Sequence, residues 1–355
     1  MKWPDPWLLF SYLTCSTISL IVLTSIAPDK LLQQAVMFAL GLIIFWYLSS
    51  QESAVYQAFS LLAYPVSLVL LLLPLIFGSS VRGSARWIPI GSFQLQPAEL
   101  AKPLLILAFT NFLTHFSPRR LRNLLLNLAL FVLPAYLIYR QPDLGTALSL
   151  FSLFAVQIFV GGLPLWTILF SFALGIVGYR YLPHLLHDYQ LARLTTFLDP
   201  MEDPLGAGYN VIQSVIAVGS GSLFGKGLGH GTQSHLRFLP ENHTDFIFAS
   251  LAEELGLVGS TLVILILGAL LYRLLSLGTH SRAPFARLVF FGSFGVLAFQ
   301  TFVNIGMNIG IAPVTGVTLP LISYGGSSIL GTAIILGIAS SFARGENSPL
   351  LLEIK

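Results

Sequence analysis

Long apolar stretches alternate with short polar segments along most of the chain. A helix needs about 20 apolar residues to cross the roughly 30 Å hydrocarbon core of a membrane. The pattern therefore predicts ten membrane-spanning helices, at 8–26, 31–50, 54–78, 98–116, 122–139, 143–160, 164–182, 248–276, 286–310 and 323–343. Because further spans follow the first at once, we interpret it as a membrane helix rather than a cleaved signal peptide.

The composition agrees with this pattern. Of the 355 residues, 55% are hydrophobic and only 9% are charged, whereas an ordinary globular domain has about 25% charged residues. A chain with so few charged residues lacks the polar surface to stay soluble, which excludes soluble enzymes and disordered scaffolds. Nucleic-acid binders are excluded because 18 cations among 355 residues cannot form a phosphate-binding stripe. The expected fold is an all-α, polytopic membrane protein with one domain over 1–355. Cys15 is the one cysteine in the sequence, so no intrachain disulfide forms.

The distribution of charge predicts the orientation in the membrane. Ten spans place both termini on one side, and the segments on that side hold nine cations against five in the short segments opposite. Positively charged loops stay in the cytoplasm, which predicts cytoplasmic termini. The long connection 183–247, between the seventh and eighth spans, is then extracytoplasmic. Residues 188–254 contain eight of the fifteen acidic residues, and a connection of this length is usually functional.

Glu99 and Lys102 are spaced i,i+3 in the first turns of a predicted helix that begins near Pro97. They are interpreted either as an ion pair at the membrane interface or as a charged pair that faces a polar cavity. We favour the second interpretation, because ionisable groups at membrane depth are costly and usually functional.

Two neighbouring segments allow both structural and functional interpretations. Arg82, Arg86 and Trp87 form either an anchor at the membrane interface or a site where guanidinium groups bind phosphate and the indole contacts a sugar. Asp143 precedes the predicted span 143–160, and we favour a helix-capping role for its carboxylate.

The glycine-rich run 219–231 does not fit a nucleotide-binding P-loop. Ser220 occupies the position of the first glycine in that motif, and Gly227 follows Lys226 where Ser or Thr would be required. The run is either a flexible turn or a loop whose backbone N–H groups bind an anion beside Lys226.

Asp245 lies where a polar segment enters an apolar helix, which suits either a helix cap or a functional carboxylate. If the helix starts there, Glu253 lies about 80° away and shares its face, whereas Glu254 points elsewhere. Further along, the Gly- and Pro-rich segment 310–325 predicts broken helices or a re-entrant segment, with close helix packing as the alternative. No metal-site spacing or Ser-His-Asp order is recognisable.

Taken together, these segments resemble the SEDS family (shape, elongation, division and sporulation) of bacterial cell-wall proteins. The order 231–233 followed by 238–246 is more similar to the elongation branch than to the division branch. The segments that carry the resemblance are 83–87, 96–102, 141–147, 197–200 with 203–204, 206–214, 225–233, 238–248 and 320–327.

The resemblance implies a multi-pass protein of the bacterial cytoplasmic membrane that polymerises lipid II into β-1,4 glycan at the outer face, during cell elongation and rod-shape maintenance. It also implies a class B penicillin-binding protein as partner, besides lipid II, the growing glycan strand and the bilayer, and no nucleic acid. By this resemblance, the essential loop aspartate of the family corresponds to Asp245, its fourth-helix Glu and Lys to Glu99 and Lys102, and its loop tryptophan to Trp87.

That chemistry assigns roles to the candidate residues. Asp245 is the expected general base for the acceptor hydroxyl, and cations are expected to stabilise the leaving pyrophosphate. The predicted substrate-binding residues are Arg86, Trp87, Glu99, Lys102, Lys226, Gln233 and Arg237. No cofactor is expected, and a requirement for a divalent cation is left open.

Two other functions fit parts of the sequence. A lipid II flippase would use Glu99, Lys102 and the interrupted helices near 310–325 as a substrate path. A non-catalytic scaffold for the cross-linking partner would leave the charged groups unexplained. We favour the polymerase, because Glu99, Asp245, Arg86 and Trp87 all fall on the predicted outer side.

Overall fold

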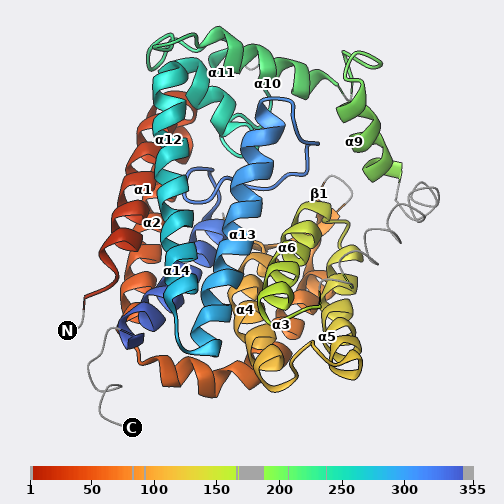
Figure 1. Ribbon diagram of the computed structural model, residues 1–355. Helices are drawn as coiled ribbons and strands as arrows, with labels where there is room; N and C mark the ends of the chain where they lie inside the picture. Colours follow the sequence, from red (N-terminus) through yellow and green to blue (C-terminus); the bar gives the residue numbers. More distant parts are fainter. Residues whose placement is uncertain are drawn as a thin grey trace.

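The computed structural model describes residues 3–81, 84–91, 93–164, 167, 188–206, 208–236 and 238–346. Most of the predicted span 164–182 and the predicted site residue Arg237 lie outside these ranges. The helices, shown in Figure 1, are α1 (Pro6–Ile26), α2 (Pro28–Ser50), α3 (Ser53–Phe77), α4 (Pro97–His115), α5 (Leu121–Tyr139), α6 (Leu144–Val160), α9 (Asp188–Leu198), α10 (Tyr209–Ser220), α11 (Thr232–His235), α12 (Ile247–His280), α13 (Pro284–Asn308) and α14 (Gly326–Glu346).

Several helices begin where the sequence provides a start signal. Proline occupies the first position of α1, α2, α4 and α13, where its missing N–H costs nothing. Asp5 caps α1, since its side chain accepts hydrogen bonds from the backbone N–H groups of Trp7 and Leu8. These signals explain why the observed starts lie within a few residues of the predicted ones.

Seven of the described helices are long and apolar enough to cross a membrane: α1, α2, α3, α5, α12, α13 and α14. This confirms a multi-pass helical protein but not the full count of ten. α6 is apolar but has only 17 residues, and α4, which carries Glu99 and Lys102, is not among the seven.

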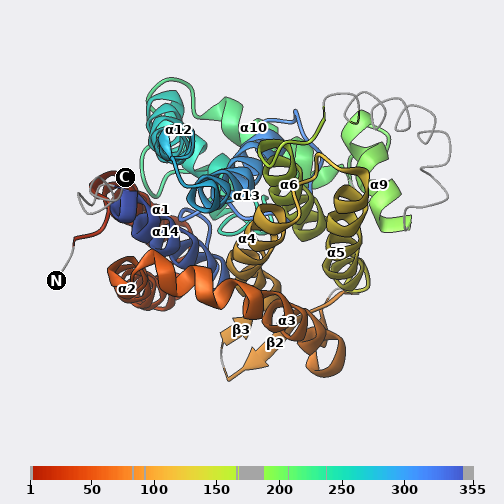
Figure 2. The same cartoon turned by 60° about the horizontal axis from the view of Figure 1, so that its bottom comes forward.

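The burial of the helices identifies the centre of the bundle. In α14, 89% of the most apolar window is buried inside the protein, against 22% in α2 and 28% in α3. α14 packs mainly against α2 and also against α4 (Figure 2). The outer helices expose leucine, isoleucine and valine side chains, as expected where lipid rather than water surrounds the protein.

The all-α expectation is incomplete, because the segment between α3 and α4 forms a small antiparallel sheet of β1 (Ser79–Val81), β2 (Ser84–Ile90) and β3 (Phe93–Leu95) in the order β1-β2-β3. Ile90 pairs with Phe93, and Gly91 adopts φ +60° in the short connection between them, a conformation that favours glycine. The pattern of apolar stretches does not predict these strands, because the segment is short and lies between two membrane helices. The strand–glycine–strand order was the signal for a hairpin.

α12 is interrupted at Gly256, whose φ of 68° and ψ of −164° are not helical. The break exposes backbone groups that the glycine-rich loop satisfies: Lys226 N donates to Glu253 O at 3.0 Å, and Leu257 N donates to Ser222 O at 2.9 Å. A Cβ atom on Gly225 or Gly256 would lie within about 2.2 Å of the facing backbone. The glycines therefore allow two backbones to touch.

The predicted interruption near 310–325 is confirmed, because the chain between α13 and α14 is not helical. The segment crosses the interior with Val317, Leu319 and Ile322 buried. Irregular backbone of this kind is tolerated where protein or a cavity surrounds it.

The start of α1 and the end of α14 lie together. Asp5 N donates to Ser340 Oγ at 2.8 Å, and Arg273 Nη2 contacts Asp5 Oδ2 at 2.6 Å. The other end of α1 carries Ser25, which bonds Glu254 beside the glycine-rich loop. The two ends of the bundle are thus distinct, with α10 and α11 at the end farther from Asp5 (Figure 1).

Candidate functional site

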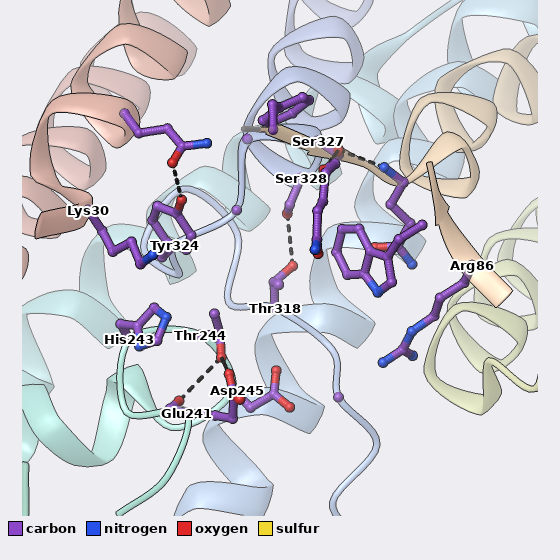
Figure 3. Close-up of a pocket in the computed structure, with 18 residues that line it drawn as sticks. Lys30, Arg86, Glu241, His243, Thr244, Asp245, Thr318, Tyr324, Ser327 and Ser328 are labelled. Atoms are coloured by element: carbon purple, nitrogen blue, oxygen red, sulfur yellow. Dashed lines mark hydrogen bonds between the residues drawn. The ribbon is translucent and has the colours of Figure 1, made fainter. Parts of the chain in front are cut away.

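A cavity of about 460 Å³ lies where α2, α4 and α14 begin (Figure 3). Five parts of the chain supply its wall: the first turns of α2, the sheet, the cap of α4, the segment before α12, and the irregular segment with the start of α14. The residues that line it are Lys30, Gln33, Arg86, Trp87, Phe93, Gln94, Gln96, Glu241, His243, Thr244, Asp245, Gly316, Thr318, Tyr324, Gly325, Gly326, Ser327 and Ser328. The cavity thus combines three of the predicted site residues, Asp245, Arg86 and Trp87.

Two asparagine side chains hold the backbone at Asp245. Asn304 and Asn308 are one helical turn apart on α13, and their Nδ2 atoms donate to Asp245 O at 3.1 Å and 3.0 Å. Both asparagines are fully buried. Asn308 Oδ1 also accepts from Ala249 N at 3.0 Å, so one side chain joins Asp245 to the first turn of α12.

The three residues before Asp245 are fixed in the same way. Ser323 Oγ donates to Thr244 O at 2.8 Å, Tyr324 N donates to His243 O at 2.9 Å, and Ser250 Oγ donates to Asn242 O at 3.2 Å. Four successive carbonyls are therefore bonded to donors from α12, α13 and the irregular segment. A carboxylate on such a backbone keeps a defined position, which suits a catalytic group.

Gly316 lies opposite the Asp245 carboxylate. A Cβ atom at this position would be 3.6 Å from Asp245 Oδ2, and the φ of +75° is one that glycine adopts readily. Any larger side chain would occupy cavity space next to the carboxylate.

Asp143 anchors Arg86 at the opposite wall. Its Oδ1 accepts from Thr146 N at 3.1 Å, which confirms the predicted cap on α6. The same carboxylate contacts Arg86 Nη1 at 3.3 Å and accepts from Gln96 Nε2 at 2.9 Å. Asp143 is 3% exposed, so its capping and arginine-holding roles share one buried group. The sequence indicated the first of these roles only.

Glu99 and Lys102 form a short ion pair within the bundle. Lys102 Nζ lies 2.7 Å from Glu99 Oε1, and the two side chains are 3% and 10% exposed. The cavity is lined by Gln96, three residues earlier, rather than by the pair itself. Their predicted role in substrate binding stays a prediction.

Lys226 and Gln233 lie in a second cluster, around Glu253. Glu253 is fully buried. Its Oε1 accepts from Lys226 Nζ at 2.8 Å and from Gln233 N at 3.0 Å, and its Oε2 accepts from Ser234 N at 3.2 Å. The residues of this cluster are not among those that line the cavity, and the predicted face shared by Glu253 and Asp245 is not formed.

Glu254 completes this cluster. It is also fully buried and lies 2.9 Å from His235 Nε2 and 3.2 Å from Gly229 N. The N–H groups of Lys226 and Gly227 donate to the carbonyls of Glu253 and Glu254, so this part of the glycine-rich loop packs on α12. The predicted role of Lys226 and Gln233 in substrate binding stays a prediction. In the described part of the chain, no group of three His, Cys, Asp or Glu side chains is arranged to hold a metal ion.

Sequence reasoning missed Lys30, Gln33, His243 and Tyr324. Tyr324 Oη donates to Gln33 Oε1 at 2.7 Å, and the Lys30 ammonium lies 6.0 Å from the Tyr324 ring centroid. Burial, with the nearby Lys30 ammonium, lowers the pKa of His243, while Glu241 and Asp29 act in the opposite direction. Nothing local in the sequence distinguishes Lys30 from a lysine that anchors a helix at the membrane interface.

Comparison with known proteins identifies the family of this chain. The profile of the FtsW/RodA/SpoVE family, described as cell cycle proteins, matches residues 8–348. The chain belongs to the FtsW/RodA/SpoVE family. It is 40% identical to the peptidoglycan glycosyltransferase MrdB of Escherichia coli K12, over 95% of this chain and 92% of that protein. It is 43% identical to a probable peptidoglycan glycosyltransferase FtsW of Aliivibrio salmonicida, over 78% of this chain and 69% of that protein.

Solved structures of the family share the fold. RodA of Thermus thermophilus superposes with a TM-score of 0.74 at 32% identity, covering 97% of this chain and 98% of that one. A chain from a peptidoglycan synthase complex, described as coordinating polymerization and crosslinking, matches with a TM-score of 0.83 at 36% identity. The match covers 98% of this chain and 99% of that one. The resemblance noted from the sequence is therefore confirmed at the level of family and fold.

Proposed function

We propose that this protein is a peptidoglycan glycosyltransferase that polymerises lipid II into β-1,4 glycan. Family membership and the names of its relatives support the reaction class. The observation that carries the proposal is the carboxylate of Asp245 in the wall of a polar cavity, on a backbone fixed by Asn304 and Asn308.

The residues of the cavity suit the chemistry. The C4 hydroxyl of the acceptor sugar loses a proton as its oxygen attacks the anomeric carbon of the donor, and the Asp245 carboxylate accepts that proton. The bond from the anomeric carbon to the pyrophosphate breaks, and the leaving group departs with the electron pair. Direct attack inverts the anomeric centre, as a β-linkage from an α-pyrophosphate requires.

The proposed topology follows the sequence prediction. It has one domain over 1–355 with ten spans and cytoplasmic termini. The connection 183–247 is then on the extracytoplasmic side. Arg273 and Arg344 support this orientation, because Arg273 contacts Asp5 at the start of α1 and Arg344 bonds the end of α2. Cations concentrated at one end are typical of the cytoplasmic side. A class B penicillin-binding protein is the proposed partner, since a structural relative acts in a complex that coordinates polymerization with crosslinking.

The test is polymerisation of lipid II by the purified protein with its partner, comparing wild type with Asp245→Asn. We expect a loss of at least about 100-fold in rate, because removal of a general base typically costs that much. Glu202→Gln is the matched control: Glu202 is an exposed carboxylate in the same long connection and should leave the rate unchanged. An Asp245→Asn protein with near wild-type rate would disprove the assignment. Lipid II translocation without polymer from wild type would favour the flippase.

A further inference from the structure

The predicted pyrophosphate-binding cations that the structure describes are already neutralised by buried carboxylates. Arg86 pairs with Asp143, Lys102 with Glu99 and Lys226 with Glu253, and the three acidic side chains are only 2%, 10% and 0% exposed. A cation that compensates a buried carboxylate cannot leave it without stranding that charge, which typically costs several kcal/mol. These cations are poorly suited to exchange partners during a reaction cycle.

Lys30 is in a different situation. It is the other cation among the described residues that line the cavity, and its carboxylate partner, Asp29, is 73% exposed at a distance of 3.5 Å. An exposed pair of this kind contributes little, because water solvates both charges when they separate. The Lys30 ammonium therefore exchanges Asp29 for another anion at low cost.

The neighbours of Lys30 provide further donors to an anion. Tyr324 Oη donates to Gln33 Oε1 at 2.7 Å, which orients the Gln33 amide and leaves its Nε2 atom to donate two hydrogen bonds. Glu241 and Asp245 are the two carboxylates among the described residues of the wall. Glu241 accepts a hydrogen bond from Thr244 Oγ1 at 3.1 Å. In the view of Figure 3, Lys30, Tyr324 and His243 lie on one side, Arg86 lies on the other, and Asp245 lies between them.

We propose that Lys30, assisted by Gln33, binds a phosphate group of a polyprenyl-pyrophosphate substrate, and that Arg86 mainly shapes the opposite wall. The proposal rests on the proposed function, because it names the part of that site which takes the pyrophosphate. A phospholipid headgroup carries the same phosphate chemistry, so the experiment must separate the two sources.

The experiment measures lipid II polymerisation, and its inhibition by undecaprenyl pyrophosphate, for wild type, Lys30→Met and Lys30→Arg. In Lys30→Met we expect KM for lipid II and the inhibition constant to rise about tenfold, the value of one charge-assisted hydrogen bond. Lys30→Arg should return both constants to near their wild-type values, because arginine keeps the positive charge. The matched control is Arg140→Met, since Arg140 is an exposed cation bonded to Tyr136 Oη and is not a residue of the described cavity wall.

Nanodiscs of neutral and of anionic phospholipid separate the two sources of phosphate. If Lys30 binds the substrate, the ratio of KM between Lys30→Met and wild type is the same in both lipids. A ratio that changes with the lipid headgroup, or equal KM values for Lys30→Met and wild type, overturns the proposal. Asp245→Asn in the same assay keeps the two questions apart: an active Asp245→Asn protein refutes the general base, whereas an unchanged Lys30→Met protein refutes only the phosphate site.

Discussion

The cavity around Asp245 and the cluster around Glu253 both contain charged side chains, which are rare in this chain, but the surroundings of these side chains differ. Both contain carboxylates and a lysine, and both draw residues from 226–254. In the cluster, Glu253 and Glu254 are fully buried and accept hydrogen bonds from Lys226, His235 and backbone N–H groups of the loop. In the cavity, the side chains of Asp245 and Lys30 form part of the wall of an open space.

The difference shows how this protein compensates a charge that it buries completely. A buried carboxylate costs several kcal/mol unless the protein supplies partners, and Glu253 is supplied with five donors. In the cavity, Arg86 pairs with the buried Asp143, whereas Lys30 pairs with the exposed Asp29. What separates the two regions is how far the charged side chains are exposed, because Glu253 and Glu254 are fully buried, whereas Asp245 is only partly buried in the wall of the cavity.

The strongest test of this comparison is Glu253→Ala. We expect a loss of roughly 3 kcal/mol in the free energy of unfolding, because Lys226 and the N–H groups of Gln233 and Ser234 lose their acceptor. Thermal unfolding in detergent measures it as a midpoint several degrees lower. The folded fraction should still polymerise lipid II at a rate close to wild type.

Asp245→Asn should show the reverse behaviour, with an unchanged midpoint and no polymer. The contrast fails if Glu253→Ala is as inactive as Asp245→Asn at a temperature where it is fully folded. In that case the Glu253 cluster would belong to the catalytic site.

The second test is Asn308→Ala, which removes one of the two donors to Asp245 O and the acceptor for Ala249 N. We expect kcat to fall about 10- to 100-fold with little change in KM, since a small displacement of a catalytic group has effects of this size. Asn127→Ala is the matched control. Asn127 on α5 also donates to two backbone carbonyls, those of Phe116 and Asn123, but is not part of the described cavity wall. Equal losses of kcat in both variants would show that any buried asparagine has this effect.

The smallest expected effect concerns His243. Because burial lowers its pKa below the ordinary 6.5, the unfolded chain binds a proton more readily than the folded protein. Stability is therefore present above pH 6.5 and is lost as the pH falls towards the lowered pKa. We expect the thermal unfolding midpoint to fall less between pH 7 and pH 5 in His243→Gln than in wild type. This difference should be smaller than the shift in midpoint caused by Glu253→Ala. Identical pH profiles for the two proteins would contradict this.

Much of the architecture was predictable because lipid imposes a simple rule. The starts of α1, α2, α4 and α13 follow from proline and from the length of apolar runs, and the interruption between α13 and α14 follows from Gly310, Pro313 and Gly316. The sheet was missed because a short hairpin between two apolar stretches has no long-range pattern. The local signal for it was Gly91, whose φ of +60° suits a tight connection between strands.

The site was only partly predictable, since proximity depends on helix packing. Asp245, Arg86 and Trp87 lie in one cavity, but nothing local in the sequence indicates that Lys30, some 215 positions before Asp245, reaches the same wall. Likewise, Lys226 follows a glycine-rich run that suits anion binding, and only the break at Gly256 shows that the run docks on α12. Spacing along the chain predicts faces of single helices, not the contacts between distant ones.

The position of α14 has a consequence for biogenesis. The most buried of the candidate spans follows all the other described helices along the chain, and its first residues, Gly326 to Ser328, form part of the cavity wall. During synthesis the earlier helices enter the membrane before the helix that fills the space between α2 and α4 exists. The packed centre can therefore form only after α14 has entered the membrane, and a chain truncated before Gly326 lacks both this helix and part of the pocket wall.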